Sequence, residues 1–411
     1  MLRLVSLLGI AVMLVVCFAL SNNRRAVSWR LVGVGLLVQA VLGVTFLFWA
    51  DGNAALQAVG RGFDQFLQLG QKGSEFVFGP LATGKTGMGF VFAFQILPTL
   101  IFFSSFMAVL YHLGVMQLVV RAMAWVMVRV LGTSGSESLS ACANVFVGQT
   151  EAPLLVRPYL AGMTLSELHT IMVGGFCTIA GGVFALYVQF IGGDDPAARA
   201  EIAGHLMVAS VMAVPAGLVC SKLLWPETER SETMGTVSRT AESPYGNVVE
   251  AAAGGASDGL KLALNVGAML IAFLALINVI DFLLPAGLTL QSLLGLVFWP
   301  IAAVMGVPAG EITTLSELIG TKLVATELVA YSDLGQMVAA GTVSPRTKMM
   351  ASFALCGFAS FGSVAIQIGG LGAMAPERRT DLARLGIRAM FAGAIATCMT
   401  ACVAGALMGG E

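Results

Sequence analysis

Long stretches without a charged residue are the feature that most constrains this chain. Nine runs of at least 19 residues contain no Asp, Glu, Lys or Arg. Each is close to the roughly 20 apolar residues that a helix needs to cross a bilayer. Only 11% of the 411 residues are charged, against about 25% in soluble domains. The chain is therefore predicted to be an all-α polytopic membrane protein whose main solvent is the lipid bilayer.

Eight of the nine runs predict spanning helices. The ninth, 282–310, contains three prolines and is interpreted as an interfacial helix near 288–307, because proline interrupts helical hydrogen bonding. The spanning helices are expected at 4–23, 31–50, 87–111, 168–192, 202–222, 260–281, 349–371 and 389–410.

Basic residues set the expected orientation. The first run resembles a signal peptide, but Arg24, Arg25 and Arg30 follow it, and positive flanks stay in the cytoplasm. We therefore expect a retained helix with the N-terminus outside, and eight crossings place the C-terminus outside as well. The inside segments then hold 14 of the 22 Lys and Arg residues. These segments are 24–30, 112–167, 222–261 and 377–388.

Composition and motifs argue against several function classes. A net charge of −1 without a basic run offers no face that could neutralise nucleic-acid phosphates. The seven cysteines lie in apolar stretches without ligand spacing, which indicates small core residues and neither disulfides nor a metal site. No nucleophile elbow, P-loop or dinucleotide fingerprint occurs. The chain is therefore not expected to be an enzyme or to carry a cofactor.

The order of predicted elements occurs twice. Each copy runs from a spanning helix through an amphipathic or interfacial segment and two half-length stretches to two further spanning helices. The polar stretch from Pro226 to Tyr245 joins the copies, so the second enters the membrane from the opposite side and forms an inverted repeat. The expected regions are N-terminal scaffold helices with an interfacial helix (1–86), the first repeat (87–224), a cytoplasmic connector (225–259) and the second repeat (260–411).

The half-length stretches predict two re-entrant hairpins. About 13 helical residues reach roughly 20 Å, just past the middle of a ~30 Å hydrocarbon core. Each tip carries one carboxylate at a matching position, in Thr150-Glu151 and in Thr326-Glu327. A carboxylate inside the membrane is a functional candidate. The alternative is that either Glu lies in an exposed loop.

Glycines and hydroxyls cluster in the spanning helix after each hairpin. Such clusters can open a helix in mid-membrane and turn its carbonyl groups toward an ion. Close packing of helices through small residues is the alternative. In the first case two hairpin tips and two broken helices converge on one cavity. The clusters comprise Gly174, Gly175, Thr178, Gly181 and Gly182, and Gly357, Ser360, Gly362 and Ser363.

Two further polar residues near the hairpins have alternative interpretations. Asn144 is either an ion ligand or a buried amide bonded to a neighbouring carbonyl. Lys322, five residues before Glu327, either tethers that Glu or extends to the membrane surface.

Several motifs resemble the concentrative nucleoside transporter family over nearly the whole chain. The most specific is the hairpin sequence Gly148-Gln149-Thr150-Glu151-Ala152-Pro153 in its context. The others begin at Gly73, Phe92, Phe102, Gly174, Lys261 and Glu327. The resemblance implies a bacterial member in the inner membrane, with both termini periplasmic, and a homotrimer in which each protomer moves a hairpin-bearing domain like an elevator.

The resemblance also implies site residues. In the first hairpin, Gln149, Thr150 and Glu151 would meet the nucleobase, with Val183 against it. Glu327 would accept hydrogen bonds from ribose hydroxyls. The sugar side would be lined by Phe358, Ser360 and Ser363. A sodium ion would be bound by Asn144, Thr178 and the carbonyl groups of Val147 and Ile179.

The sequence departs from the family pattern around the sugar. The family usually has Asn-Glu-Phe at the second tip, where this chain has Thr326-Glu327-Leu328. In the broken helix, Ser360 replaces an Asn and Gly362 replaces a Ser. Two amides thus become hydroxyls, so we expect fewer or water-bridged ribose contacts.

The function predicted from the sequence is import of nucleosides by symport with sodium. Proton coupling through Glu151 or Glu327 is the alternative, and Asn144 and Thr178 favour sodium. A non-coupled nucleoside channel or receptor is the alternative from another class. The sequence favours neither purine nor pyrimidine nucleosides, and neither ribose nor deoxyribose.

Overall fold

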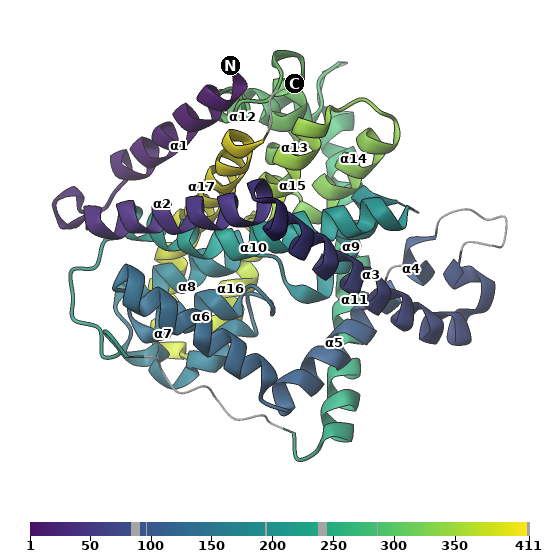
Figure 1. Cartoon of the computed structure of the whole chain (residues 1–411), viewed down its shortest axis with the longest axis horizontal. Helices are drawn as coiled ribbons and strands as arrows, with labels where there is room; N and C mark the ends of the chain where they lie inside the picture. Colours follow the sequence, from purple (N-terminus) through teal and green to yellow (C-terminus); the bar gives the residue numbers. More distant parts are fainter. Residues whose placement is uncertain (84–90, 96, 194, 237–244, 286, 409–411) are drawn as a thin grey trace.

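The computed structural model describes residues 1–83, 91–95, 97–193, 195–236, 245–285 and 287–408 (Figure 1). These residues form helices and connecting turns, with one isolated β-bridge between Ser134 and Met234. Within them, six helical stretches are long and apolar enough to cross a membrane. They are Leu2–Ala19, Trp29–Phe48, Ala93–His112, Pro196–Leu224, Val248–Leu283 and Pro376–Leu407. The predicted all-α membrane fold is confirmed.

The helices follow the predicted order of elements. In the N-terminal region they are α1 (Leu2–Ala19), α2 (Trp29–Gly43) and α3 (Ala50–Phe78). The first repeat contains α4 (Phe92–Gln95), α5 (Leu97–His112), α6 (Val115–Leu131), α7 (Gly135–Ala143), the 3₁₀ helix η4 (Ala152–Gly162), α8 (Leu165–Cys177), α9 (Gly181–Gly192) and α10 (Pro196–Leu224). The second contains α11 (Val248–Leu283), α12 (Leu290–Met305), α13 (Ile312–Val324), α14 (Glu327–Ala339), α15 (Pro345–Leu355), α16 (Phe361–Met374) and α17 (Arg379–Leu407).

Two predicted spanning helices are interrupted in the middle. The helix expected at 168–192 is α8 followed by α9, and the one at 349–371 is α15 followed by α16. Both interruptions fall within the glycine and hydroxyl clusters, so the clusters mark broken helices.

Three helices begin well before the predicted spanning segments: α10 at Pro196, α11 at Val248 and α17 at Arg379. Helix α11 begins at Val248, so residues 248–259 of the predicted connector are helical. The side chain of Asn247 caps this helix by accepting a hydrogen bond from the Glu250 N–H. Parts of three predicted segments lie outside the described residues. They are 87–90 of the span 87–111, 409–410 of the span 389–410, and 237–244 of the connector.

Each predicted hairpin is a pair of short helices that pack against one another. In the first, α7 packs against η4, and in the second, α13 packs against α14. The second arm of the first hairpin is a 3₁₀ helix that contains Pro153 and Pro158. Proline lacks an N–H and clashes with the preceding turn, which disfavours an α-helix there.

Helices α10 and α17 form the centre of the molecule, whereas α11 lies with α5 at its edge (Figure 1). In α10 and in the stretch ending with α17, 83% of an 18-residue apolar window is buried. In α11 the buried share is 6%. The apolar surface of α11 is therefore left for lipid or for another copy of the chain.

Segments far apart in the sequence are joined by backbone hydrogen bonds. The N–H of Asn22 donates to the Leu224 carbonyl at 2.8 Å, and the N–H of Gly135 donates to the Thr233 carbonyl at 2.9 Å. The two chain ends meet elsewhere (Figure 1), where Arg3 donates to the Met408 carbonyl.

Candidate functional site

The two broken helices touch at their interruptions. Gly357 has a φ of +105°, a region that favours glycine, and a Cβ there would lie 2.6 Å from the Cys177 carbonyl carbon. The first hairpin tip reaches the same region, because the Gly181 N–H donates to the Phe146 carbonyl at 3.1 Å. Three of the four interrupted elements thus converge, as the sequence predicts.

The fourth element brings a buried carboxylate. Glu327 is the first residue of α14 and only 6% exposed. The Tyr187 hydroxyl of α9 donates to Glu327 Oε1 at 3.0 Å. The Tyr187 ring stacks on the Tyr331 ring with centroids 4.2 Å apart. The second hairpin tip is therefore fastened to the first broken helix.

Tyr187 is a residue that sequence reasoning missed. The sequence feature that could have indicated it is a phenol inside a predicted spanning helix, where the hydroxyl needs a hydrogen-bond partner. Tyr331 completes the arrangement by donating from its hydroxyl to the Ser352 carbonyl at 2.7 Å. Both phenols then have defined partners, which fixes the ring pair beside Glu327.

The carboxylate of the first tip has a different environment. Glu151 is exposed, and its carboxylate lies over Gly148, where a Cβ would collide with it. The same Cβ position lies 3.5 Å from the Ala180 Cβ, between α8 and α9. Thr150 is half-buried, and its methyl group lies against Gly370 of α16. Glu151 thus lies at the first broken helix, and Thr150 lies at the second.

Gln149 is held by an amide of the second repeat. Gln367 of α16 donates from Nε2 to Gln149 Oε1 at 2.9 Å and to the Met172 carbonyl at 3.1 Å. A carbonyl requires a donor, so Met172 fixes which end of the Gln367 amide faces it. Gln149 must then offer its oxygen to Gln367, so its NH₂ group points away from that amide.

Gly175 provides the room for this amide pair. A Cβ at Gly175 would lie 2.6 Å from Gln367 Nε2 and 2.7 Å from the Gln149 Cβ. Gln367 is 1% exposed. Sequence reasoning missed it, although an amide within a predicted spanning helix was a usable signal.

The predicted sodium ligands gather beside α8. Asn144 Nδ2 donates to the Ser140 carbonyl at 3.0 Å, whereas its Oδ1 is buried and accepts no hydrogen bond from any described residue. A Cβ at Gly174 would lie 3.4 Å from Asn144 Nδ2, and Thr178 Oγ1 donates to the Gly174 carbonyl at 2.8 Å. A buried amide oxygen without a donor fits a cation ligand, because a cation satisfies it without a proton.

The other two predicted cation ligands belong to the same tip and interruption. Val147 is half-buried at the first tip, and Ile179 is 1% exposed between α8 and α9. The Ile179 N–H faces Ser210 Oγ of α10 at 3.4 Å. The four proposed ligands therefore come from one hairpin tip and one interruption.

The predicted sugar-side hydroxyls form the start of α16. Ser360 Oγ accepts a hydrogen bond from the Ser363 N–H at 3.3 Å and lies 3.1 Å from Ser363 Oγ. Ser360 is thus the N-cap of this helix. Phe358 is half-buried, and Val183 on α9 is 5% exposed.

Lys322 does not extend to the membrane surface, because it is 1% exposed. Its charge interacts with that of Glu327, but its hydrogen bonds go elsewhere. Its ammonium group donates to the Ala354 carbonyl at 2.9 Å, the Thr397 hydroxyl at 3.1 Å and the Cys356 carbonyl at 3.3 Å. It binds the interruption between α15 and α16.

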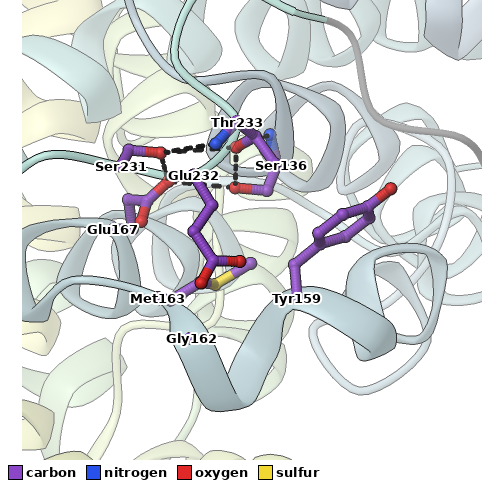
Figure 2. Close-up of a pocket in the computed structure, with 8 residues that line it drawn as sticks. All are labelled: Ser136, Tyr159, Gly162, Met163, Glu167, Ser231, Glu232 and Thr233. Atoms are coloured by element: carbon purple, nitrogen blue, oxygen red, sulfur yellow. Dashed lines mark hydrogen bonds between the residues drawn. The ribbon is translucent and has the colours of Figure 1, made fainter.

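A shallow polar recess lies at the base of the first hairpin, away from its tip (Figure 2). Glu167 accepts hydrogen bonds from Ser231 at 2.6 Å and Ser136 at 3.1 Å. The hydroxyls of Ser136 and Thr233 are 2.9 Å apart. These bonds fasten the start of the connector to the first hairpin.

Known proteins match the chain along its length. Family models for the Na+ dependent nucleoside transporter N-terminus and C-terminus match residues 8–81 and 205–405, and a model named nucleoside recognition matches 93–194. An uncharacterized transporter of Haemophilus influenzae is 45% identical over 98% of this chain and 97% of its own. Sodium/nucleoside cotransporter 1 of Mus musculus is 43% identical over 98% of this chain and 64% of its own.

Solved structures agree in fold. The structure of CNTnw in an inward-facing substrate-bound state shares 45% identity and a TM-score of 0.92 over the whole of both chains. A CNTnw variant in an outward-facing state has a TM-score of 0.90 at 43% identity, over 99% of this chain and 98% of that one. Fold and site thus define a multi-pass membrane transporter and not an enzyme. The chain belongs to the sodium-dependent, or concentrative, nucleoside transporter family.

Proposed function

We propose that this protein imports nucleosides by symport with sodium. The observation that carries the proposal is Glu327, a carboxylate buried at a hairpin tip with a neutral phenol as its hydrogen-bond donor. A carboxylate accepts strong, charge-assisted hydrogen bonds from hydroxyl groups, and vicinal ribose hydroxyls supply two of them. Membership in a family of nucleoside transporters supports this role.

The other site residues have complementary roles in this proposal. Gln149, Thr150 and Glu151 contact the nucleobase, and Val183 packs against it. The Gln149 amide presents its NH₂ group to the base, because Gln367 occupies its oxygen. On the sugar side, Phe358, Ser360 and Ser363 line the ribose, with the two hydroxyls shared between ligand and helix cap.

Sodium binds between the first tip and the first broken helix in this proposal. The ligands are Asn144 Oδ1, Thr178 Oγ1 and the carbonyl oxygens of Val147 and Ile179. The unpaired buried Asn144 oxygen supports the assignment. Since the Asn144 side chain lies beside Gly174 of α8, an ion bound by this set would hold α8 and the first tip together and favour the site that receives the nucleoside.

The proposed mechanism is an elevator-like alternating access within a homotrimer. The hairpins and broken helices move as one body past a scaffold that includes the exposed helix α11. We place the protein in a bacterial inner membrane with both termini in the periplasm. Proteolysis of a terminal tag in oriented membrane vesicles tests this orientation, and a tag cleaved only from the cytoplasmic face contradicts it.

Uptake into proteoliposomes tests the function. Radiolabelled uridine or adenosine should accumulate when sodium is high outside, and should not accumulate in choline medium. Uptake that persists in choline but collapses with an uncoupler would show proton coupling instead. Equilibration without accumulation would show a channel, and binding without uptake a receptor.

A further inference from the structure

Lys322 places an ammonium group at the end of a broken helix, inside the protein. Its three acceptors are the Ala354 carbonyl, the Cys356 carbonyl and the Thr397 hydroxyl, at 2.9–3.3 Å. Ala354 lies in the last turn of α15, and Cys356 follows the helix directly. The lysine comes from α13, the first arm of the second hairpin.

The oxygen atoms at the C-terminal end of α15 favour a cation. The last carbonyl groups of a helix have no intrahelical donor, and the helix dipole makes that end partly negative. In a buried setting such oxygens need a partner. An ammonium with three N–H donors supplies one bond to each of the three oxygens.

The same arrangement of elements occurs in the first repeat with a different residue. There the first arm of the hairpin, α7, ends at Asn144, and α8 ends just before Thr178. Asn144 offers a buried oxygen without a donor where the second repeat offers an ammonium. An oxygen without a donor is open to an external cation, whereas an ammonium fills such a position itself.

We infer that Lys322 occupies the cation place of the second repeat, as a covalently attached counterpart of the sodium ion in the first. The comparison rests on the placement of the two residues and not on their alignment, since each joins the first arm of a hairpin to the following broken helix. The lysine therefore holds hairpin 2 on α15 permanently, whereas hairpin 1 is held on α8 only when sodium is bound.

The inference predicts that one sodium ion accompanies each nucleoside. This consequence rests on the proposed function, whereas the occupancy of the second place by Lys322 is testable without transport. Any ion that binds only the folded protein raises its stability by an amount that grows with ion concentration. A second ion site therefore steepens the dependence of the unfolding temperature on sodium.

The test compares the wild type with Lys322→Asn and Lys322→Met in detergent. Lys322→Asn supplies an amide oxygen, as Asn144 does, and is expected to show a steeper sodium dependence of the unfolding temperature, with choline as control. Lys322→Met supplies no oxygen and should unfold at a lower temperature without the steeper dependence. Equal sodium dependence in the wild type and Lys322→Asn would overturn the inference.

A flux measurement on the wild type keeps the inference testable even if both variants fail to fold. Parallel uptake of radioactive sodium and nucleoside into proteoliposomes should give a ratio of one. A ratio of two contradicts a lysine in the second cation place. No nucleoside uptake at all would contradict the proposed function, but would leave the stability test of Lys322 standing.

Discussion

The two hairpin carboxylates occupy matching positions in the sequence but different environments. Glu327 is buried and receives a hydrogen bond from Tyr187, whereas Glu151 is exposed and lies over Gly148. A buried carboxylate gains more from a ligand hydroxyl than an exposed one, because water competes less for it. At the residue scale, Glu327 should therefore contribute more to nucleoside affinity than Glu151.

We expect Glu327→Gln to raise the nucleoside KM about 10–100-fold, since hydrogen bonds to charged groups contribute about 1.5–3 kcal/mol. Sodium-driven uptake by proteoliposomes at varied nucleoside concentration measures this change. Glu229→Gln alters an exposed carboxylate in the same chemical way and should leave the KM unchanged. An unchanged KM in Glu327→Gln would remove this residue from the site.

Gln367→Leu should weaken recognition of the nucleobase indirectly, because Gln367 holds Gln149 and does not itself contact the base in the proposed site. The Gln149 oxygen and the Met172 carbonyl would lose their donor, and each hydrogen bond of this kind contributes about 0.5–1.5 kcal/mol. We expect the KM to rise about 3–10-fold, with unequal changes for uridine and cytidine, whose base edges differ in donors and acceptors. Competition uptake measures the ratio. Equal changes for both would indicate a purely structural role, and the exposed Gln71→Leu serves as control.

At the scale of elements, two departures from the family pattern become understandable. The Thr326 hydroxyl accepts from the Val329 N–H, and the Ser360 hydroxyl accepts from the Ser363 N–H. Both residues are therefore N-caps of the helices that start at the site, and Asn, Ser and Thr all perform this role. The replacement of amide by hydroxyl preserves the helix starts while it removes one donor from each.

The interruption between α15 and α16 should tolerate no side chain at Gly357. Gly357→Ala combines a φ of +105° with a Cβ only 2.6 Å from the Cys177 carbonyl carbon, and backbone strain of this kind costs about 1–3 kcal/mol. We expect a lower unfolding temperature in detergent and reduced uptake. Gly369→Ala in α16 meets no atom within 4 Å and should be neutral or stabilising. Equal stability of the two variants would contradict this account.

A buried lysine, Lys222, joins two carboxylates at the base of the first hairpin, Glu137 and the less buried Glu227 at 3.4 Å. Lys222 of α10 lies 2.7 Å from Glu137 of α7, with side chains 7% and 1% exposed. Lys222→Met would leave a buried carboxylate without its partner, which costs about 3–5 kcal/mol. Lys261→Met breaks the exposed pair with Asp258 and should cost about 0–1 kcal/mol. Thermal unfolding compares the two, and similar losses would mean that Glu137 finds another partner.

At the scale of the whole molecule, the peripheral helix α11 carries much exposed apolar surface. Ile271 and Phe282 are 76% and 87% exposed within one protomer. Such a surface suits both lipid and contact between copies of a scaffold helix. The buried helices α10 and α17 need no such partner.

We expect the purified protein to have a native mass of three chains. Native mass spectrometry or light scattering in mild detergent measures it. Ile271→Lys places a charge on the exposed face of α11 and should shift the distribution toward single chains if this face joins the copies. A monomeric wild type in several detergents would contradict the proposed trimer.

Much of the fold could be predicted from the sequence because membrane insertion leaves a strong one-dimensional signal. Apolar length located the spanning segments, and glycine clusters located both broken helices, since glycine weakens helices wherever it occurs. The start of α11 at Val248 was missed because residues 248–259 are less apolar than a membrane span. Local capping by Asn247, and not hydropathy, sets that boundary.

The sequence by itself determined the membrane class, the inverted repeat, the two Glu-bearing tips and the family, because each depends on local composition or on motif. Only the tertiary structure decided which carboxylate is buried, that Tyr187 and Gln367 hold the site residues, and that Lys322 binds the end of α15. These pairings join residues 140, 218 and 32 positions apart. No local pattern encodes contacts at such separation, since two of them arise only when the two repeats pack together and the third only when hairpin 2 packs on α15.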